Sequence, residues 1–130
     1  MIERFSSESG FEPLVGYSRA VRCGPFVLVA GTTATGPGGE LVGVGDAYAQ
    51  ARQALANVEE ALRRAGTVLA DVVQTRVYVT DIERWEEVGR AHAETFAEIR
   101  PVTTMIEVAK LIDPRMLVEI EAIAYVGAPT

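Results

Sequence analysis

Val118-Glu119-Ile120-Glu121-Ala122-Ile123-Ala124-Tyr125-Val126 is the most regular stretch of the sequence. Apolar residues recur at every second position, which is the period of a β-strand with one buried face. We therefore predict a strand over about 117–126. Its apolar face would carry Val118, Ile120, Ala122, Ala124 and Val126. Its opposite face would carry Glu119, Glu121, Ile123 and Tyr125.

Two amphipathic segments precede this strand and predict helices. The first helix is predicted over about 46–65, because Asp46 is a favourable N-cap and Gly66 suits the left-handed residue that ends many helices. Its apolar stripe consists of Ala47, Ala51, Ala54, Leu55, Val58 and Leu62. The second helix is predicted over about 82–98, with Asp81 as its cap. Its apolar stripe consists of Trp85, Val88, His92 and Phe96.

The remaining apolar runs predict further strands, which lie at about 2–6, 17–32, 72–79 and 102–108. Gly24-Pro25 divides the second of these runs into two strands. One face of the third run would carry Val73, Thr75, Val77 and Val79. The order of elements predicts one α+β domain over residues 1–130, with both helices covering one face of a sheet.

The composition excludes several classes of protein. The chain has 130 residues and 48% hydrophobic residues, enough for one packed domain. Its formal net charge of −6 disfavours a nucleic-acid partner or an anionic membrane. One Cys and one His are too few for a zinc cluster or a disulfide, so we expect no metal site. The N-terminal residues do not resemble a targeting signal, and we expect a cytoplasmic protein.

One face of the predicted sheet has no helix to cover it. That face combines apolar and polar side chains, namely Arg76, Tyr78, Met105, Ile123 and Tyr125. Such a face is too apolar for open water, so we expect another subunit to cover it.

Carboxylates on that face are the best candidates for chemistry. Glu119 and Glu121 share a strand face, and Glu107 would join them if the strand at 102–108 paired with the strand at 117–126. Burial under another subunit would raise their pKa values and favour a general base. The alternative, ion pairs with neighbouring arginines or lysines, is the stronger interpretation at this stage. We interpret His92 as a packed, hydrogen-bonded histidine.

The last third of the chain resembles a known family signature. Pro101-Val102-Thr103-Thr104-Met105-Ile106-Glu107-Val108-Ala109-Lys110-Leu111, followed by 118–124, is similar to the signature of the RidA (YjgF) family of reactive-intermediate deaminases, also described as endoribonuclease L-PSP-like. Residues 50–58 and 71–81 resemble the first helix of that family and the strand before its second helix. The resemblance covers nearly the whole chain.

The resemblance implies a fold, an assembly and a reaction. The fold would be chorismate-mutase-like, with one mixed β-sheet and two helices packed on one face. The assembly would be a homotrimer that binds a small-molecule ligand between its subunits. The reaction would be the hydrolysis of small enamines or imines, a deaminase activity that requires no metal or organic cofactor.

Several residues match family positions. Tyr17 matches a cleft tyrosine, and Glu119 matches a glutamate thought to hold the attacking water. Gly31 matches a cleft glycine, but Ala30 replaces the serine before it. The resemblance therefore implies Glu119 and Tyr17 as catalytic residues. The ligand-binding residues would be Gly31, Thr103, Thr104 and Met105.

The most consequential departure from the family is Thr103. Active deaminases have an arginine there that grips the substrate carboxylate, and its loss would weaken the binding of 2-imino acids by about two orders of magnitude or more. Met105 replaces a frequent cysteine, and Gly89 replaces a frequent asparagine. Either another cation substitutes, or the ligand differs. The candidate cations are Arg19, Arg76 and Arg100.

Two functions remain open. The first is a deaminase-like hydrolase acting on enamine, imine or carbonyl metabolites, with specificity altered by Thr103. The second is a trimeric module that binds a small metabolite without catalysis. RNA cleavage, which is attributed to some relatives, is disfavoured by the acidic charge.

Overall fold

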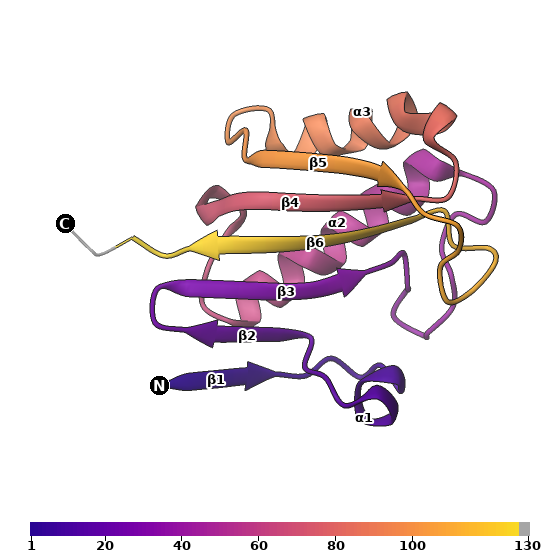
Figure 1. The fold of residues 1–130 in the computed structure, drawn as a ribbon. Coiled ribbons are helices and arrows are strands. Elements are labelled where there is room, and N and C mark those ends of the chain that lie inside the picture. The colour runs from indigo at the N-terminus through magenta and orange to yellow at the C-terminus, as the bar shows by residue number, and fades with distance from the viewer. Residues whose placement is uncertain (128–130) are drawn as a thin grey trace.

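The architecture is a single mixed β-sheet with helices on one face, seen in a computed structural model that describes residues 1–127. The strand order is β1-β2-β3-β6-β4-β5 (Figure 1). The strands are β1 (Ile2–Phe5), β2 (Ala20–Cys23), β3 (Phe26–Thr32), β4 (Val72–Val79), β5 (Val102–Glu107) and β6 (Val118–Tyr125). The helices are α1 (Phe11–Val15), α2 (Ala47–Arg64) and α3 (Trp85–Phe96). Short 3₁₀ turns lie at Leu69–Asp71 and Ile82–Arg84.

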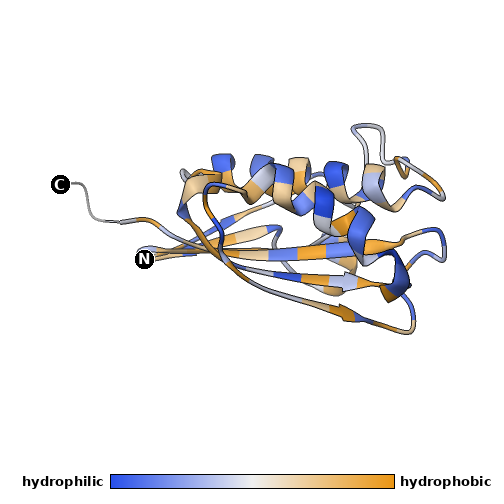
Figure 2. Cartoon of the chain, turned by 90° about the horizontal axis from the view of Figure 1, so that it is seen from above, coloured by the Kyte–Doolittle hydropathy of each residue, from blue (hydrophilic) through white to orange (hydrophobic). Residues whose placement is uncertain are grey.

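The sheet is mixed because β4 and β5 run parallel, while the other pairs are antiparallel. A parallel pair needs a crossover connection, and α3 supplies it. Both long helices lie on the same face of the sheet, and the opposite face is bare (Figure 2). The predicted α+β class, with two helices on one face of a mixed sheet, is confirmed.

Helix α2 is fixed to the sheet by its apolar stripe, and all six predicted members of that stripe are buried. Asp46 caps the helix by accepting a hydrogen bond from the backbone N–H of Ala49 at 2.9 Å. Gln50 is fully buried on the same helix. Its amide donates to the carbonyls of Gly43 and Arg115 and accepts from the backbone N–H of Leu117. One side chain thus holds the loops on both sides of the core in place.

Two details of the predicted core are wrong. Val73 is exposed, because a register shift between Val72 and Gln74 turns it away from the helices. Trp85 is 54% exposed rather than part of the α3 stripe, whose buried members are Val88, Ala91 and Phe96. Trp85 is the first residue of α3, and burial on this helix begins only one turn later, at Val88, so the predicted stripe starts one turn too early.

The strand at 102–108 does not pair with the strand at 117–126, so the condition under which Glu107 would join Glu119 and Glu121 is not met. Strand β5 pairs only with β4 and forms the edge of the sheet, while β6 lies between β3 and β4. Glu107 is therefore remote from the carboxylates of β6, and its carboxylate accepts the backbone N–H of Ile82.

The bare face of the sheet exposes many large apolar side chains. They include Ile2, Phe26, Leu28, Val102, Ile106 and Tyr125. The strand registers place them on the face opposite the helices. Within residues 1–127, none of the helices has the length and apolar character required to cross a bilayer.

Candidate functional site

Glu119 and Gly31 meet where strands β3 and β6 lose their regular register. The shift falls between Val29 and Thr32 and brings Gly31 under the Glu119 carboxyl group. A Cβ atom at position 31 would lie 2.9 Å from Cδ of Glu119, closer than real side chains approach. Without a side chain at Gly31, the Glu119 carboxyl group can lie directly against the backbone of β3, and the structure brings together these two predicted site residues.

Arg19 connects this pair to Tyr17. Its Nη1 donates to the carbonyl of Gly31 at 2.7 Å and to Oγ1 of Thr32 at 3.1 Å. Its Nη2 donates to the hydroxyl of Tyr17 at 3.1 Å, and the guanidinium lies 5.4 Å from the centroid of that ring. Tyr17, Arg19, Gly31 and Glu119 therefore form one group of side chains, which we call the glutamate cluster.

Glu12 is the residue of this region that sequence reasoning missed. It lies on the short helix α1 and is only 3% exposed. Its Oε2 is 3.6 Å from Nε of Arg19, and the hydroxyls of Ser6 and Ser7 donate to its carboxylate. A glutamate in a short polar segment has the pattern of a surface residue, so the sequence carries no signal for its burial.

The surroundings of Glu12 stabilise its charged form. Burial by itself would raise its pKa, but the hydrogen bonds from Ser7 and Ser6 and the positive charge of Arg19 outweigh that effect and lower the pKa. Arg19 therefore has a permanent counterion beneath it. This pair holds the guanidinium against Tyr17 and Gly31.

Replacing Glu12 by glutamine is expected to lower the free energy of unfolding by about 1–2 kcal/mol at neutral pH, because a charge-assisted interaction is lost. A carboxyl whose folded-state pKa is lowered stabilises the fold above its unfolded pKa, and that stability disappears as the pH falls through the folded pKa. The difference in Tm between wild type and variant should therefore shrink in acid. Thermal unfolding across pH measures it, with the exposed Glu8→Gln as control. A difference that is independent of pH would contradict the prediction.

Glu119 differs from Glu12 in the direction of its pKa. Its half-buried carboxyl loses hydration, which raises its pKa, and the charge of Glu121 adds to this effect while Arg19 opposes it. Among residues 1–127 no ion pair involves Glu119. The carboxylate of Glu119 is therefore a stronger base than that of a solvated glutamate.

Glu121 forms an ion pair, as the alternative interpretation of the carboxylates predicts. Its Oε1 lies 3.5 Å from Nη1 of Arg76, and the hydroxyl of Tyr78 donates to the same oxygen. That bond is the main reason that the pKa of Tyr78 is raised. Glu121 is thus engaged in an ion pair, whereas Glu119 is available for chemistry.

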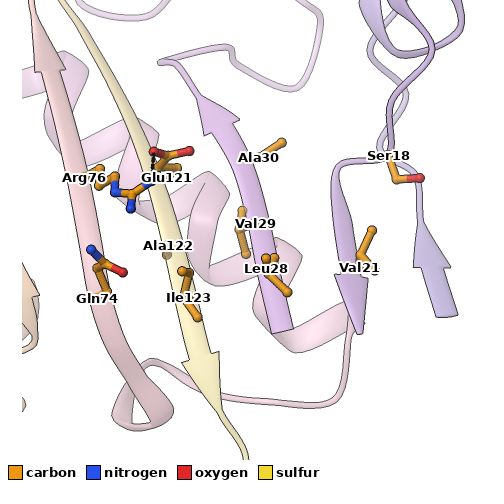
Figure 3. A pocket seen from close by; sticks show the side chains of 10 residues that line it. All are labelled: Ser18, Val21, Leu28, Val29, Ala30, Gln74, Arg76, Glu121, Ala122 and Ile123. Carbon is orange, nitrogen blue, oxygen red and sulfur yellow. Dashed lines mark ion pairs between the residues drawn. The ribbon is translucent and has the colours of Figure 1, made fainter. Parts of the chain in front are cut away.

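Two hollows lie on the bare face of the sheet. The larger has a volume of about 290 Å³ and extends from Ser18 and Leu28 to Arg76 and Glu121. Figure 3 shows Arg76 and Glu121 facing each other, with apolar side chains from the neighbouring strands beside them. The second hollow, of about 270 Å³, is lined by Arg76, Tyr78, Thr104 and Ile106. Thr104 therefore belongs to the bare face.

Thr103 lies on the opposite face from Thr104. It is in register with the fully buried Thr75, and the two hydroxyls are 2.8 Å apart. The imidazole of His92 on α3 bonds to Thr75 as well, with Nε2 at 2.8 Å. Met105, two residues along β5, packs against the core. The interpretation of His92 as a packed, hydrogen-bonded residue agrees with this geometry.

The predicted site residues therefore form two separate groups within one protomer. Glu119 pairs with Tyr78 of β4, and Thr103 pairs with Thr75 on the other side of the same strand. Strand β4 separates them, and their side chains project on opposite faces of the sheet. Thr103 and Met105 thus do not join Tyr17, Gly31 and Glu119 in a single protomer.

The three candidate cations occupy different surroundings. Arg19 lies in the glutamate cluster with Glu12 as its counterion, and Arg76 is paired with Glu121. Arg100 is exposed, has a positive φ of 54°, and directly precedes Pro101 at the start of β5. Among residues 1–127, Arg100 is the candidate that forms no ion pair.

Comparison with known proteins adds to this geometry. The family model described as endoribonuclease L-PSP matches residues 7–126. The crystal structure of Rv2704 from Mycobacterium tuberculosis, a member of the YjgF/YER057c/UK114 family, is 58% identical and has a TM-score of 0.88, with 97% of this chain and 100% of that chain covered.

Two curated proteins are similar over most of their length. An uncharacterized protein of Streptomyces coelicolor is 42% identical, with 98% of this chain and 94% of the relative covered. The 3-aminoacrylate deaminase RutC of Acinetobacter baylyi is 32% identical, with 88% and 90% covered.

Proposed function

The chain belongs to the YjgF/RidA family and has its chorismate-mutase-like α+β fold, and from this premise we propose that it is a single-domain, cofactor-independent enzyme that hydrolyses small enamine, imine or related carbonyl metabolites. The observation that carries the proposal is the half-buried Glu119, whose pKa is raised, lying against Gly31 and near Tyr17. The deaminase activity named for the Acinetobacter relative, on 3-aminoacrylate, is of the same chemical type.

In the proposed reaction, water adds to the carbon of a C=N bond. Glu119 accepts one proton from the water as the C–O bond forms, and this proton passes to the nitrogen. The hydroxyl proton of the resulting carbinolamine is then transferred through Glu119 to the nitrogen as the C–N bond breaks, so that ammonia leaves and a C=O bond remains. Loss of hydration around Glu119 makes its carboxylate a better proton acceptor than a fully solvated glutamate.

Tyr17 is proposed to orient the ligand. Because Arg19 donates a hydrogen bond into the Tyr17 oxygen, the phenol hydrogen is directed elsewhere. It can therefore donate to an imine nitrogen or a carbonyl oxygen of the ligand. Arg19 is already satisfied by Glu12, Gly31 and Tyr17, so we propose that it positions Tyr17 rather than replacing the missing carboxylate anchor.

We propose that the active unit is a homotrimer with its ligand site between subunits. Within one protomer, Glu119 and Thr103 lie on opposite faces of the sheet, so a ligand that touches both needs residues from two copies. The exposed apolar side chains of the bare face support association through that face.

Replacing Leu28 by glutamate is expected to disrupt this assembly, because Leu28 is 42% exposed at the centre of the apolar face and a carboxylate would have to be desolvated there. Light scattering should give a mass about three times 14.0 kDa for the wild type and a lower mass for the variant. Leu14→Glu on α1, where the side chain is 83% exposed, is the matched control and should keep the wild-type mass. Equal masses for both variants would contradict the proposed interface.

The proposed activity is tested by generating 2-iminopropionate in situ and following its decay with and without the protein. Acceleration that saturates with substrate supports the proposal. Because Thr103 stands where active family members have an arginine, we expect slow turnover of this anionic substrate and faster turnover of a neutral imine of similar size. No acceleration of either substrate would reject the enzyme.

The second candidate is a binding module without catalysis. It is favoured by the pairing of Arg19 with Glu12 and of Arg76 with Glu121, and by the bond between the hydroxyls of Thr103 and Thr75, because none of these groups is left as an unpaired cation beside a ligand. A thermal-shift screen of small carbonyl compounds separates the two functions. An increase in Tm without turnover favours the module, and an increase accompanied by turnover favours the enzyme.

A further inference from the structure

The hydroxyl of Thr103 is the exposed end of a chain of three hydrogen-bonding groups. His92 Nε2 lies 2.8 Å from Thr75 Oγ1, which lies 2.8 Å from Thr103 Oγ1. Thr75 is fully buried, whereas Thr103 is exposed at the sheet edge. A direct contact between Thr103 Oγ1 and His92 Nε2 is longer, at 3.5 Å. The half-buried imidazole is therefore linked to the Thr103 hydroxyl chiefly through the hydroxyl of Thr75.

The hydrogen bonds of this chain can all point toward His92 or all point toward Thr103, because each hydroxyl donates only one hydrogen. If His92 Nε2 carries no hydrogen, Thr75 donates to it and Thr103 donates to Thr75, so that Thr103 offers only lone pairs outward. If Nε2 carries a hydrogen, His92 donates to Thr75 and Thr75 donates to Thr103. The Thr103 hydrogen is then free for an acceptor outside the chain, in place of the Pro101 carbonyl at 3.3 Å.

We propose that His92 sets the direction of this chain and thereby makes Thr103 an anchor for an acceptor oxygen of the ligand, a carboxylate or carbonyl oxygen, whenever Nε2 carries a hydrogen. The inference rests on the proposed function, which places the ligand beside Thr103. His92 is a positioning residue here, since it acts through Thr75 and Thr103.

The protonation state of His92 responds to few other groups. Burial lowers its pKa, so the imidazole is neutral at neutral pH. On its own helix, Arg90 and Glu94 are engaged with Tyr48 of α2, as is Arg52. On the strands, Arg76 and Tyr78 of β4 lie on the opposite face, while Glu107 of β5 is bonded to Ile82.

The ligand class follows from this arrangement. A neutral carbonyl ligand needs only the tautomer with hydrogen on Nε2, which is available at neutral pH. The affinity for an organic anion increases further when His92 becomes positively charged in acid. The His92–Thr75–Thr103 hydrogen-bond chain thus binds carbonyl oxygens at neutral pH, and it binds small carboxylates more strongly as the pH falls. An arginine at position 103 would instead bind carboxylates at every pH.

The sequence contains a single histidine, so imidazole ¹⁵N resonances of the full-length protein report on His92 alone. Pyruvate and its neutral amide are the probes, titrated between about pH 5 and pH 8. We expect both to shift His92 toward the tautomer with hydrogen on Nε2. Pyruvate should also raise the pKa of His92 and bind about tenfold more tightly at the acidic end, whereas the amide should bind nearly independently of pH.

Thr75→Val and Thr103→Val serve as variants that keep the side-chain shape and remove one hydroxyl each. Both should abolish the response of His92 to the probes. Because both variants keep Glu119, any effect of the titration of Glu119 on probe binding is the same in the wild type and in the variants. Circular dichroism verifies that each variant is folded. Thr103→Val is at an exposed site, so it remains informative if Thr75→Val is unstable.

Three outcomes overturn the inference: binding of pyruvate without any change at His92, an unchanged response in folded Thr103→Val, or binding of neither probe at any pH. Turnover of 2-iminopropionate, measured on the same wild-type sample, decides the proposed function separately. Turnover without a response of His92 rejects the anchor alone. A response of His92 without turnover rejects the hydrolase and keeps the anchor.

Discussion

Replacing Glu119 by glutamine is expected to lower kcat for imine hydrolysis by about 100-fold or more, while the protein stays folded and keeps the wild-type mass. The loss of a positioned general base typically has an effect of this size. Glutamine keeps the shape of the side chain and its contact with Gly31, but it cannot accept a proton from water. Removing a half-buried carboxyl whose pKa is raised should leave stability unchanged or increase it.

Glu121→Gln is the matched control for this prediction. Glu121 lies two residues along the same strand on the same face, but it is paired with Arg76 and Tyr78. Its replacement should change kcat far less than the replacement of Glu119. Rates of ammonia release at saturating substrate provide the measurement. If both variants keep wild-type kcat, Glu119 is not the base, and the binding module becomes the better account.

The pH dependence of kcat should reflect the same carboxyl. Because burial raises the pKa of Glu119 above its usual range, the deprotonated base is lost at a higher pH than it would be for a solvated glutamate. Activity is therefore expected to fall as the pH falls through that raised pKa, and Glu119→Gln should lose this limb of the profile.

Replacing Thr103 by arginine is expected to strengthen the binding of pyruvate, and to raise kcat/KM for 2-iminopropionate, by about 100-fold. A guanidinium can form two hydrogen bonds with a carboxylate and neutralise its charge, whereas a threonine hydroxyl can form one such bond and brings no positive charge. Thr103 is exposed at the edge of the sheet, so a longer side chain can extend from it without displacing the core. Calorimetric titration and initial rates provide the two measurements.

Thr104→Arg is the control for a general effect of charge. It adds the same positive charge one residue away, on the opposite face of β5, beside Arg76. It should leave pyruvate binding nearly unchanged. Thr103→Arg should also remove the pH dependence that the His92 chain imposes on anion binding, because a guanidinium stays charged throughout that range. A flat response of Thr103→Arg would show that the missing cation does not limit this protein.

Local patterns were sufficient to predict most elements of the fold. The alternation in β6 and the stripe of α2 each report on one buried face, and both are confirmed by the burial of their residues. The errors at Val73 and Trp85 lie at a register shift and at the first residue of a helix, where the regular period of burial is interrupted. Periodicity cannot reveal an irregularity that depends on the neighbouring strand.

The sequence by itself therefore determined most of the secondary structure, though not the short helix α1. It also determined the fold class, the net negative charge and the resemblance that singles out Glu119, Tyr17 and Thr103, since these depend on residue type and local spacing. Only the tertiary structure decided which candidates meet. It placed β6 between β3 and β4, buried Glu12 beneath Arg19, and joined His92 to Thr103 through Thr75. Strand order and side-chain contacts depend on long-range packing, in which residues far apart in the chain share one desolvated space, and no local pattern encodes that.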